Sequence, residues 1–138
     1  MTERYLLDTN ILSDLIRNSH GIAAQRYRQL NDEQLCTSVI VAAELRYGAA
    51  KRRSRYLVTR VAETLDGIET VAFEPPADAV YAQLRVDLER NGNLVGPNDL
   101  LIAAQALALG LVLVTGNERE FSRIPGLKLE NWLRPSSH

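Results

Sequence analysis

The chain has 138 residues, which suits one domain with one hydrophobic core. Hydrophobic residues make up 46% and charged residues 24%, and the net charge of −1 gives no indication of a nucleic-acid partner, although a local basic patch could still bind one. The single cysteine, Cys36, excludes an internal disulfide and suits a reducing compartment. Because no apolar run approaches the ~20 residues of a membrane span, we expect a cytoplasmic protein.

Short apolar runs alternate with amphipathic stretches, a pattern typical of an α/β domain with a largely parallel sheet. The expected elements, in chain order, are a strand at 4–7, helices at 10–17 and 21–30, a strand at 34–37, helices at 38–50 and 53–65, a strand at 68–73, helices at 75–90 and 97–110, a strand at 111–115, a helical turn at 119–122 and an edge strand at 127–132.

Three residues are expected to mark helix ends. Ser38 suits an N-cap, the region around Gly48 should end the helix that Ser38 begins, and Gly110 suits a C-cap. No linker or repeat divides the chain. The sequence therefore predicts a single domain over 1–133, followed by a disordered tail at 134–138.

Four acidic residues stand beside or inside apolar runs. Asp8 ends the first predicted strand, Glu44 interrupts an apolar helix, Asp99 begins another, and Glu120 follows the strand at 111–115. A buried carboxylate is unfavourable unless it is paired, hydrogen-bonded or bound to a metal. Because no obvious cationic partner is placed beside them, these four acids predict a divalent cation held by oxygen ligands.

The positions of Asp8 and Asp99 leave a choice of roles. Asp8 falls at the carboxyl end of a strand, where open α/β sheets bind ligands, but it could also cap the next helix. Asp99 lies in a first helical turn, where the helix dipole favours an acid in any case. The preceding Gly96-Pro97-Asn98 predicts a tight entry that would hold its carboxylate rigidly.

Glu44 and Glu120 are judged by their neighbours. The residues three and four places from Glu44 carry no charge, so no helical ion pair would explain it as a solvated residue. Glu120 precedes the apolar anchor Phe121, whereas the nearby Glu118 is expected to face solvent. Both Glu44 and Glu120 are therefore candidate site residues.

The remaining polar signals are weaker. The run Lys51-Arg52-Arg53-Ser54-Arg55 is either a solvated helix junction or a phosphate-binding patch. His20 and His138 have no metal-ligand spacing around them, which argues against a zinc site or histidine-based catalysis.

Taken in order, these motifs resemble the PIN-domain family, and within it the VapC ribonuclease toxins of VapBC toxin–antitoxin pairs. The matching segments cover nearly the whole chain: Leu7–Asn10, Ser38 with Ala43–Leu45, Tyr47 and Gly48, Val95–Ala104, Val114–Asn117, Arg119–Leu127 and Glu130–Trp132.

The resemblance implies an RNase H-like α/β/α sandwich with a mainly parallel central sheet and clustered carboxylates that bind Mg²⁺ or Mn²⁺. Asp8 and Asp99 match the principal metal ligands, and Glu44 matches the third acid. Asn10 and Thr115 lie in matching motifs and are expected to support the acids. Many relatives have Asp where this chain has Asn117, so Glu120 could supply the missing charge, with Asn117 binding a metal-bound water.

The resemblance also implies a function and partners. It predicts cleavage of structured or loop RNA such as tRNA, arrest of translation and growth, a homodimer, and neutralisation by a VapB-type antitoxin that alone would contact operator DNA. An antitoxin segment could bury against Ile11, Leu15, Leu45 and Tyr47 and place a basic side chain among the acids.

Two other functions are considered. A haloacid-dehalogenase-like phosphatase is suggested by Asp8-Thr9-Asn10, but that family has an acid where this chain has Asn10. A PIN fold without catalysis, acting as a binding module, is favoured only by Asn117 and opposed by the retained acids.

Overall fold

The computed structural model describes residues 3–135, which form a parallel sheet between two layers of helices. The strands are β1 (Tyr5–Leu7), β2 (Leu35–Ser38), β3 (Glu69–Val71), β4 (Val112–Val114) and β5 (Leu129–Glu130). Their order is β3-β2-β1-β4-β5, and every neighbouring pair is parallel. The expected α/β class is confirmed, and the sheet is entirely rather than mainly parallel.

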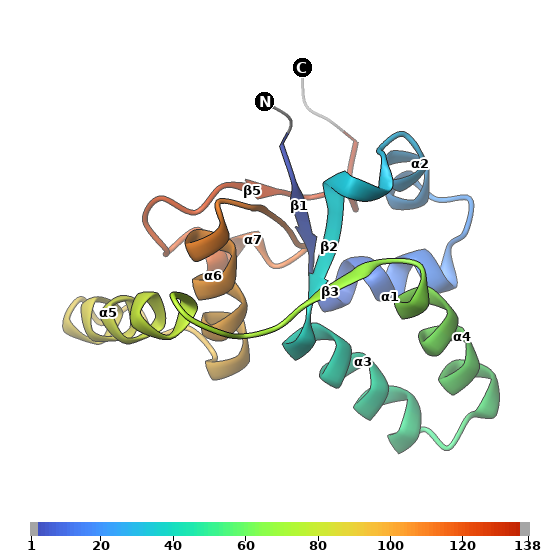
Figure 1. Ribbon diagram of the computed structural model, residues 1–138, viewed down its shortest axis with the longest axis horizontal. Coiled ribbons are helices and arrows are strands. Elements are labelled where there is room, and N and C mark those ends of the chain that lie inside the picture. The colour runs from blue at the N-terminus through green and yellow to red at the C-terminus, as the bar shows by residue number, and fades with distance from the viewer. Residues whose placement is uncertain (1–2, 136–138) are drawn as a thin grey trace.

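Helices cover both faces of the sheet, as Figure 1 shows. In that view α5, α6 and α7 lie on one side of the strands, and α1 to α4 lie on the other. The bounds are α1 (Thr9–Arg17), α2 (Ile22–Arg28), α3 (Val39–Lys51), α4 (Arg55–Asp66), α5 (Ala77–Arg90), α6 (Pro97–Leu109) and α7 (Glu118–Phe121), with a short 3-10 helix at Asp32–Gln34. None of these helices is long and apolar enough to cross a membrane.

The central strands are buried on both faces. All residues of β1 and β4 are buried, and Leu6 of β1 is paired with Cys36 on one side and Leu113 on the other. Continuous apolar strands of this kind are expected where helices cover a parallel sheet on both sides. Burial also raises the pKa of the Cys36 thiol to about 11, so the thiol stays protonated at neutral pH.

The strand order reverses between β1 and β4. The chain passes from β1 outward through β2 to β3, then returns to place β4 on the other side of β1, followed by β5. In open parallel sheets the crevice at such a reversal, beyond the carboxyl ends of the strands, is the usual ligand site. Asp8 directly follows β1 and Thr115 directly follows β4, so both lie at this point.

Several helix ends differ from the sequence prediction. Gly48 does not end α3, which continues to Lys51. The next helix begins at Arg55 rather than at 53, because Arg53 has a left-handed φ of 53° and Ser54 caps α4. The N-cap at Ser38 and the left-handed C-cap at Gly110 are confirmed.

The two strands at the edges of the sheet are shorter than expected. The predicted strands at 68–73 and 127–132 are reduced to Glu69–Val71 and Leu129–Glu130, because an edge strand pairs on one side only and its flanks leave the ladder. In the tail that was expected to be disordered, Arg134 is bound to Glu118 at 2.7 Å, while 136–138 lie outside the described residues.

Candidate active site

Asp8 is the one member of the acidic group that is fully buried. Its Oδ1 accepts a hydrogen bond from the Thr9 backbone N–H at 2.8 Å, so the residue caps α1. Its Oδ2 accepts one from the Thr115 hydroxyl, also at 2.8 Å. The two roles weighed from the sequence are therefore compatible, because the cap uses one oxygen and Thr115 holds the other toward β4.

Glu44 projects from the middle of α3 and joins three helices. Its Oε1 accepts a hydrogen bond from the Thr9 hydroxyl at 2.6 Å, and its Oε2 accepts one from the Asn98 amide at 3.3 Å. The sequence argument was right that Glu44 has no helical ion pair. Its partners are instead neutral donors from α1 and α6, and the side chain is half-buried rather than buried.

Glu120 is held next to Asp99 by two donors. The backbone N–H of Gly96 donates to Oε1 at 2.6 Å, and the Asn117 amide donates to Oε2 at 2.8 Å. The same Asn117 amide lies 3.5 Å from Oδ2 of Asp99. Asn117 therefore bridges the two carboxylates, a role for which an Asp at this position would lack the donor.

The pKa values show that the acids influence one another. Burial is the largest cause that raises the pKa of Asp99 to about 7, followed by its hydrogen bond with Glu120 and the charges of Asp8, Glu120 and Glu44. Burial likewise raises the pKa of Asp8, although the bonds from Thr115 and Thr9 oppose the rise. The Gly96 N–H is the main cause that lowers the pKa of Glu120.

Asn10 supports the loop that carries Asn117. Its side-chain oxygen accepts a hydrogen bond from the Gly116 N–H at 2.8 Å. A Cβ at Gly116 would lie 2.6 Å from the end of the Leu133 side chain, which would have to shift to make room. The Thr115 hydroxyl also accepts from the Asn117 N–H at 3.0 Å, which fixes the Asn117 backbone below the acids.

The expectation that the acids are buried is correct for Asp8 alone. Asp8 is 3% exposed, whereas Glu44, Asp99 and Glu120 are half-buried. Glu118, expected to face solvent, is half-buried and binds Arg134 and Asn131 instead of the acidic group. The four acids of the candidate site therefore comprise one buried carboxylate and three that solvent can reach.

The donor set fits a hard divalent cation. All the candidate ligands are oxygen atoms, and Mg²⁺ commonly takes one or two carboxylates directly while keeping several waters. Within residues 3–135, no three His, Cys, Asp or Glu side chains come close enough to enclose an ion. A cation here would therefore be held by a pair of carboxylates and water, and it would offset the repulsion that raises the pKa of Asp99.

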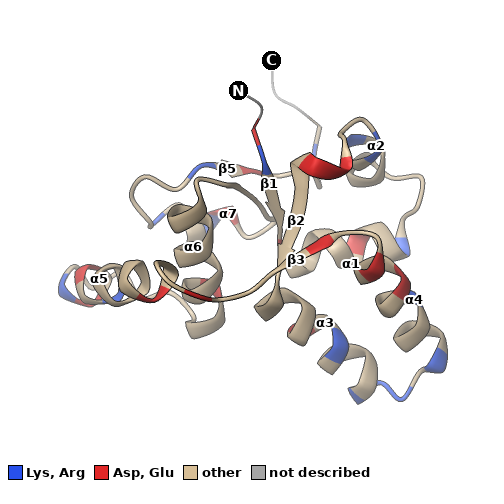
Figure 2. Ribbon diagram, viewed as in Figure 1, with Lys and Arg blue, Asp and Glu red and all other residues tan. Residues whose placement is uncertain are grey.

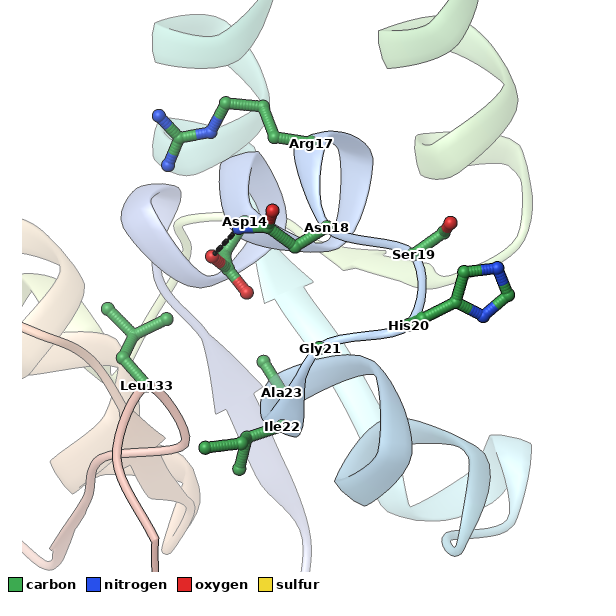
Figure 3. A pocket seen from close by; sticks show the side chains of 9 residues that line it. All are labelled: Asp14, Arg17, Asn18, Ser19, His20, Gly21, Ile22, Ala23 and Leu133. Atoms are coloured by element: carbon green, nitrogen blue, oxygen red, sulfur yellow. Dashed lines mark hydrogen bonds between the residues drawn. The ribbon is translucent and has the colours of Figure 1, made fainter.

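The larger cavities do not coincide with the acidic group. A cavity of about 560 Å³ lies between the end of α1, the start of α2 and Leu133. Figure 3 shows that its one acid, Asp14, is already bonded to Asn18, and that His20 points away from Asp14. This cavity gathers no set of reactive side chains, so the chemistry points to the carboxyl edge of the sheet.

Sequence reasoning missed three residues that hold the acids. Thr9 and Asn98 donate to Glu44, and the Gly96 N–H donates to Glu120. Thr9 and Asn98 stand directly beside Asp8 and Asp99 in the sequence, and Gly96 lies three positions before Asp99. A hydroxyl or amide beside a motif acid was the available signal, but its partner on another helix was not visible.

The chain is similar to a known protein family and to several of its named members. A PIN domain family model matches residues 5–127. The tRNA(fMet)-specific endonuclease VapC of Salmonella typhimurium is 38% identical over 130 residues, which span 94% of this chain and 98% of the relative. Ribonuclease VapC2 of Haemophilus influenzae is 37% identical over 133 residues, with the same two coverages.

Solved structures agree with the sequence comparison. A chain of the DNA-bound VapBC complex from Salmonella typhimurium has a TM-score of 0.87 and 36% identity, covering 95% of this chain and 99% of that one. A chain of the promoter-DNA-bound VapBC2 complex from Rickettsia felis has a TM-score of 0.83 and 38% identity, covering 93% and 98%. The chain therefore belongs to the PIN domain family, and within it to the VapC toxins of toxin–antitoxin systems. The haloacid-dehalogenase-like alternative is not supported.

Proposed function

We propose that this protein is a Mg²⁺- or Mn²⁺-dependent endoribonuclease toxin. The observation that carries the proposal is the hydrogen-bond network that holds four acids around the reversal of the sheet. Thr9 binds Asp8 and Glu44, and Asn117 binds Asp99 and Glu120. None of the four acids forms an ion pair with a protein cation among residues 3–135. An anionic group of this kind attracts a divalent cation, and the relatives' names describe ribonucleases.

In this proposal each residue has a defined task. Asp8 and Asp99 hold the cation, which when bound activates a water and stabilises charge on the scissile phosphate. Thr115 fixes the second oxygen of Asp8, so that carboxylate cannot rotate. Glu44 orients the attacking water, and Glu120 holds Asp99 through their shared contacts with Asn117.

The substrate we propose is a structured RNA such as tRNA. Two of the similar proteins are named tRNA(fMet)-specific endonucleases. Cleavage of a tRNA would arrest translation and growth in the cytoplasm. The accessible position of Glu44, Asp99 and Glu120 supports an RNA loop or single strand reaching them from solvent.

We also propose a VapB-type antitoxin as inhibitor, a toxin homodimer, and contact with operator DNA through the antitoxin. The similar solved structures include VapBC complexes, two of them bound to DNA. Of the apolar contacts suggested by the sequence, Ile11 and Leu45 lie in the core and are unsuitable, and Leu15 is half-buried against the core. Tyr47, in contrast, is 64% exposed. An inhibiting segment would therefore rest on the outer face of α3 and reach the acids with a basic side chain.

An in vitro assay tests the proposed activity. Purified protein should cleave tRNA in Mg²⁺ or Mn²⁺ and lose that activity in EDTA, and Asp8→Asn should be inactive with metal present. Asp14→Asn, in the cavity between α1 and α2 and away from the four acids, is the matched control and should cleave normally. Cleavage that continues in EDTA would contradict the metal mechanism, and absence of cleavage of any RNA would favour a non-catalytic binding module.

A further inference from the structure

The basic side chains differ in their partners. Arg28 and Arg123 donate hydrogen bonds to backbone carbonyls. Arg4, Arg26, Arg60, Arg85, Lys128 and Arg134 form ion pairs. Six others form neither an ion pair nor a side-chain hydrogen bond within residues 3–135, and they gather on α1, α3 and the start of α4: Arg17, Arg46, Lys51, Arg52, Arg53 and Arg55. Arg90 and Arg119 are the remaining two without such contacts.

These unpaired cations surround the turn between α3 and α4. Figure 2 shows Lys and Arg along the end of α3 and in this turn, where α3 and α4 project beyond the carboxyl end of the sheet. The chain as a whole has a net charge of −1, so this cationic surface is local. Unpaired, closely spaced cations repel one another, and a bound polyanion would relieve that repulsion.

A groove connects this surface to the acidic group. A cavity of about 230 Å³ lies between α1, α3 and α4, with Thr9 and Glu44 among its lining residues and Arg17 and Arg52 also lining it. Glu44 and Arg52 are eight residues apart, which corresponds to about 12 Å along a helix. Arg17 lines both this groove and the neighbouring cavity of Figure 3, so it lies between the two.

Gly48 lines the groove between Glu44 and Arg52 without a side chain. It lies inside α3, where glycine destabilises a helix relative to alanine. A Cβ at this position would have no atom within 4 Å, so packing within the described chain gives no reason for the glycine. A side chain here would project into the groove, and its absence leaves room for a ligand to pass close to the helix.

We propose that this groove binds the phosphate backbone of the RNA substrate a few nucleotides from the scissile bond. Arg17 and Arg52 contact the phosphates, and Gly48 lets the strand lie against α3 on its way to the acids. The inference rests on the proposed ribonuclease function and adds the path of the substrate. An RNA strand carries one charge at each phosphate, so it can contact Arg17 and Arg52 in the groove and the other unpaired cations around the α3–α4 turn.

Binding measured without cleavage tests the groove. The probe is a fluorescein-labelled single-stranded RNA of mixed sequence, titrated by fluorescence anisotropy in EDTA over a series of KCl concentrations. The double variant Arg17→Gln/Arg52→Gln should bind more weakly, and its plot of log K against log salt should be flatter by about 1.4, since each lost single-strand phosphate contact contributes about 0.7. The matched control is Arg85→Gln, which removes an ion-paired arginine on α5.

A second variant tests the space left by the missing side chain at Gly48. Gly48→Leu should fold with an unchanged or higher Tm, because leucine favours helix and the Cβ has free space, yet it should weaken RNA binding. If the double variant behaves like Arg85→Gln toward RNA, the proposal is wrong. The same holds if only binding of a polyglutamate peptide is lost, since the groove would then take an acidic protein segment.

The outcomes separate this inference from the proposed function. A wild type that binds RNA through Arg17 and Arg52 but never cleaves it with Mg²⁺ or Mn²⁺ would contradict the nuclease and leave the groove in place. If the wild type cleaves RNA normally and both variants bind RNA as tightly as the wild type, only the groove is contradicted.

Discussion

At the scale of single residues, Asp99 links the charge of the site to stability. Its pKa lies at about 7 in the folded protein, against 3.8 for an ordinary Asp. A carboxyl whose folded pKa is raised contributes stability below the unfolded pKa and loses it as pH rises through the folded pKa. Without a cation, ionised Asp99 therefore destabilises the fold above pH 7.

The variant Asp99→Asn should accordingly be more stable than the wild type at pH 8 in EDTA, and the difference should shrink toward pH 4. Mn²⁺ should raise the Tm of the wild type at pH 8 much more than that of the variant, because a ligand that binds only the folded state stabilises it. Thermal unfolding followed by circular dichroism measures both effects. The control is Asp87→Asn on α5, and a variant less stable than the wild type at pH 8 would contradict the argument.

Glu120 is the residue whose role the neighbouring amide defines. In Glu120→Gln, one carboxylate oxygen becomes an NH₂ donor. That donor would face either the Gly96 N–H or the Asn117 amide, which are donors themselves. We expect Mn²⁺ affinity and RNA cleavage to fall together by about 10–100-fold. Isothermal titration and cleavage rates measure this, with Glu118→Gln as the neighbouring control. If Glu120→Gln is neutral, the site operates with Asp8, Glu44 and Asp99 alone.

The contacts of Asn117 predict that its replacement by Asp destabilises the metal-free protein. The amide of Asn117 donates toward both Glu120 and Asp99. A carboxylate there would remove the donor and add a like charge, so the metal-free Tm should fall, and a divalent cation should restore part of it.

At the scale of elements, a buried network sets the position of α3 against the sheet. The Ser38 side chain accepts from the Ile40 N–H at 2.9 Å and donates to Oε1 of Gln105. Gln105 in turn donates to the carbonyls of Val71 and Ala72 next to β3. Ser38 and Gln105 are both 0% exposed, so α3, α6 and the sheet edge meet through groups that water cannot reach.

Ser38→Ala should therefore be more destabilising than loss of an ordinary cap. It removes a helix cap and leaves the Gln105 acceptor buried without a donor, which together should reduce the free energy of unfolding by about 2–4 kcal/mol. Ser54→Ala, which removes the α4 cap alone, should lose about 1 kcal/mol. Urea unfolding compares the two, and equal losses would show that Gln105 finds another partner.

At the scale of the whole molecule, the proposed activity and its proposed inhibition would use the same edge of the sheet. The acids come from β1–α1, α3, α6 and α7, which are far apart in the sequence. Because β1 and β4 are buried in the centre of the sheet, the edge is rigid, and the α3–α4 hairpin projects beside it. A partner that covers α3 would therefore block the route to the acids.

Expression of the chain without an antitoxin should arrest bacterial growth, and Asp8→Asn or Asp99→Asn should relieve the arrest. The carboxamide keeps the shape of each side chain while removing the charge that binds the cation. Growth curves at matched protein abundance, with Asp14→Asn as the toxic control, measure the effect. A fully toxic Asp8→Asn or Asp99→Asn would show that the assigned ligand is wrong.

The amino-acid sequence by itself determined the α/β class, the caps at Ser38 and Gly110, and the candidate acids. These depend on local periodicity, on backbone preferences and on motifs in family order. A helix cap lies within a few residues of the groups it binds, so it can be predicted from neighbours in the chain.

The tertiary structure alone decided how the acids are held and which cations remain unpaired. Thr115 reaches Asp8 across 107 positions, and Asn98 reaches Glu44 across 54. Two local expectations were also wrong. The helix α3 continues through Gly48, and Arg53, which was expected to begin the next helix, has a left-handed backbone conformation. Such contacts form only after the strands are ordered and the helices packed, because packing fixes which distant donors, acceptors and charges come within bonding distance.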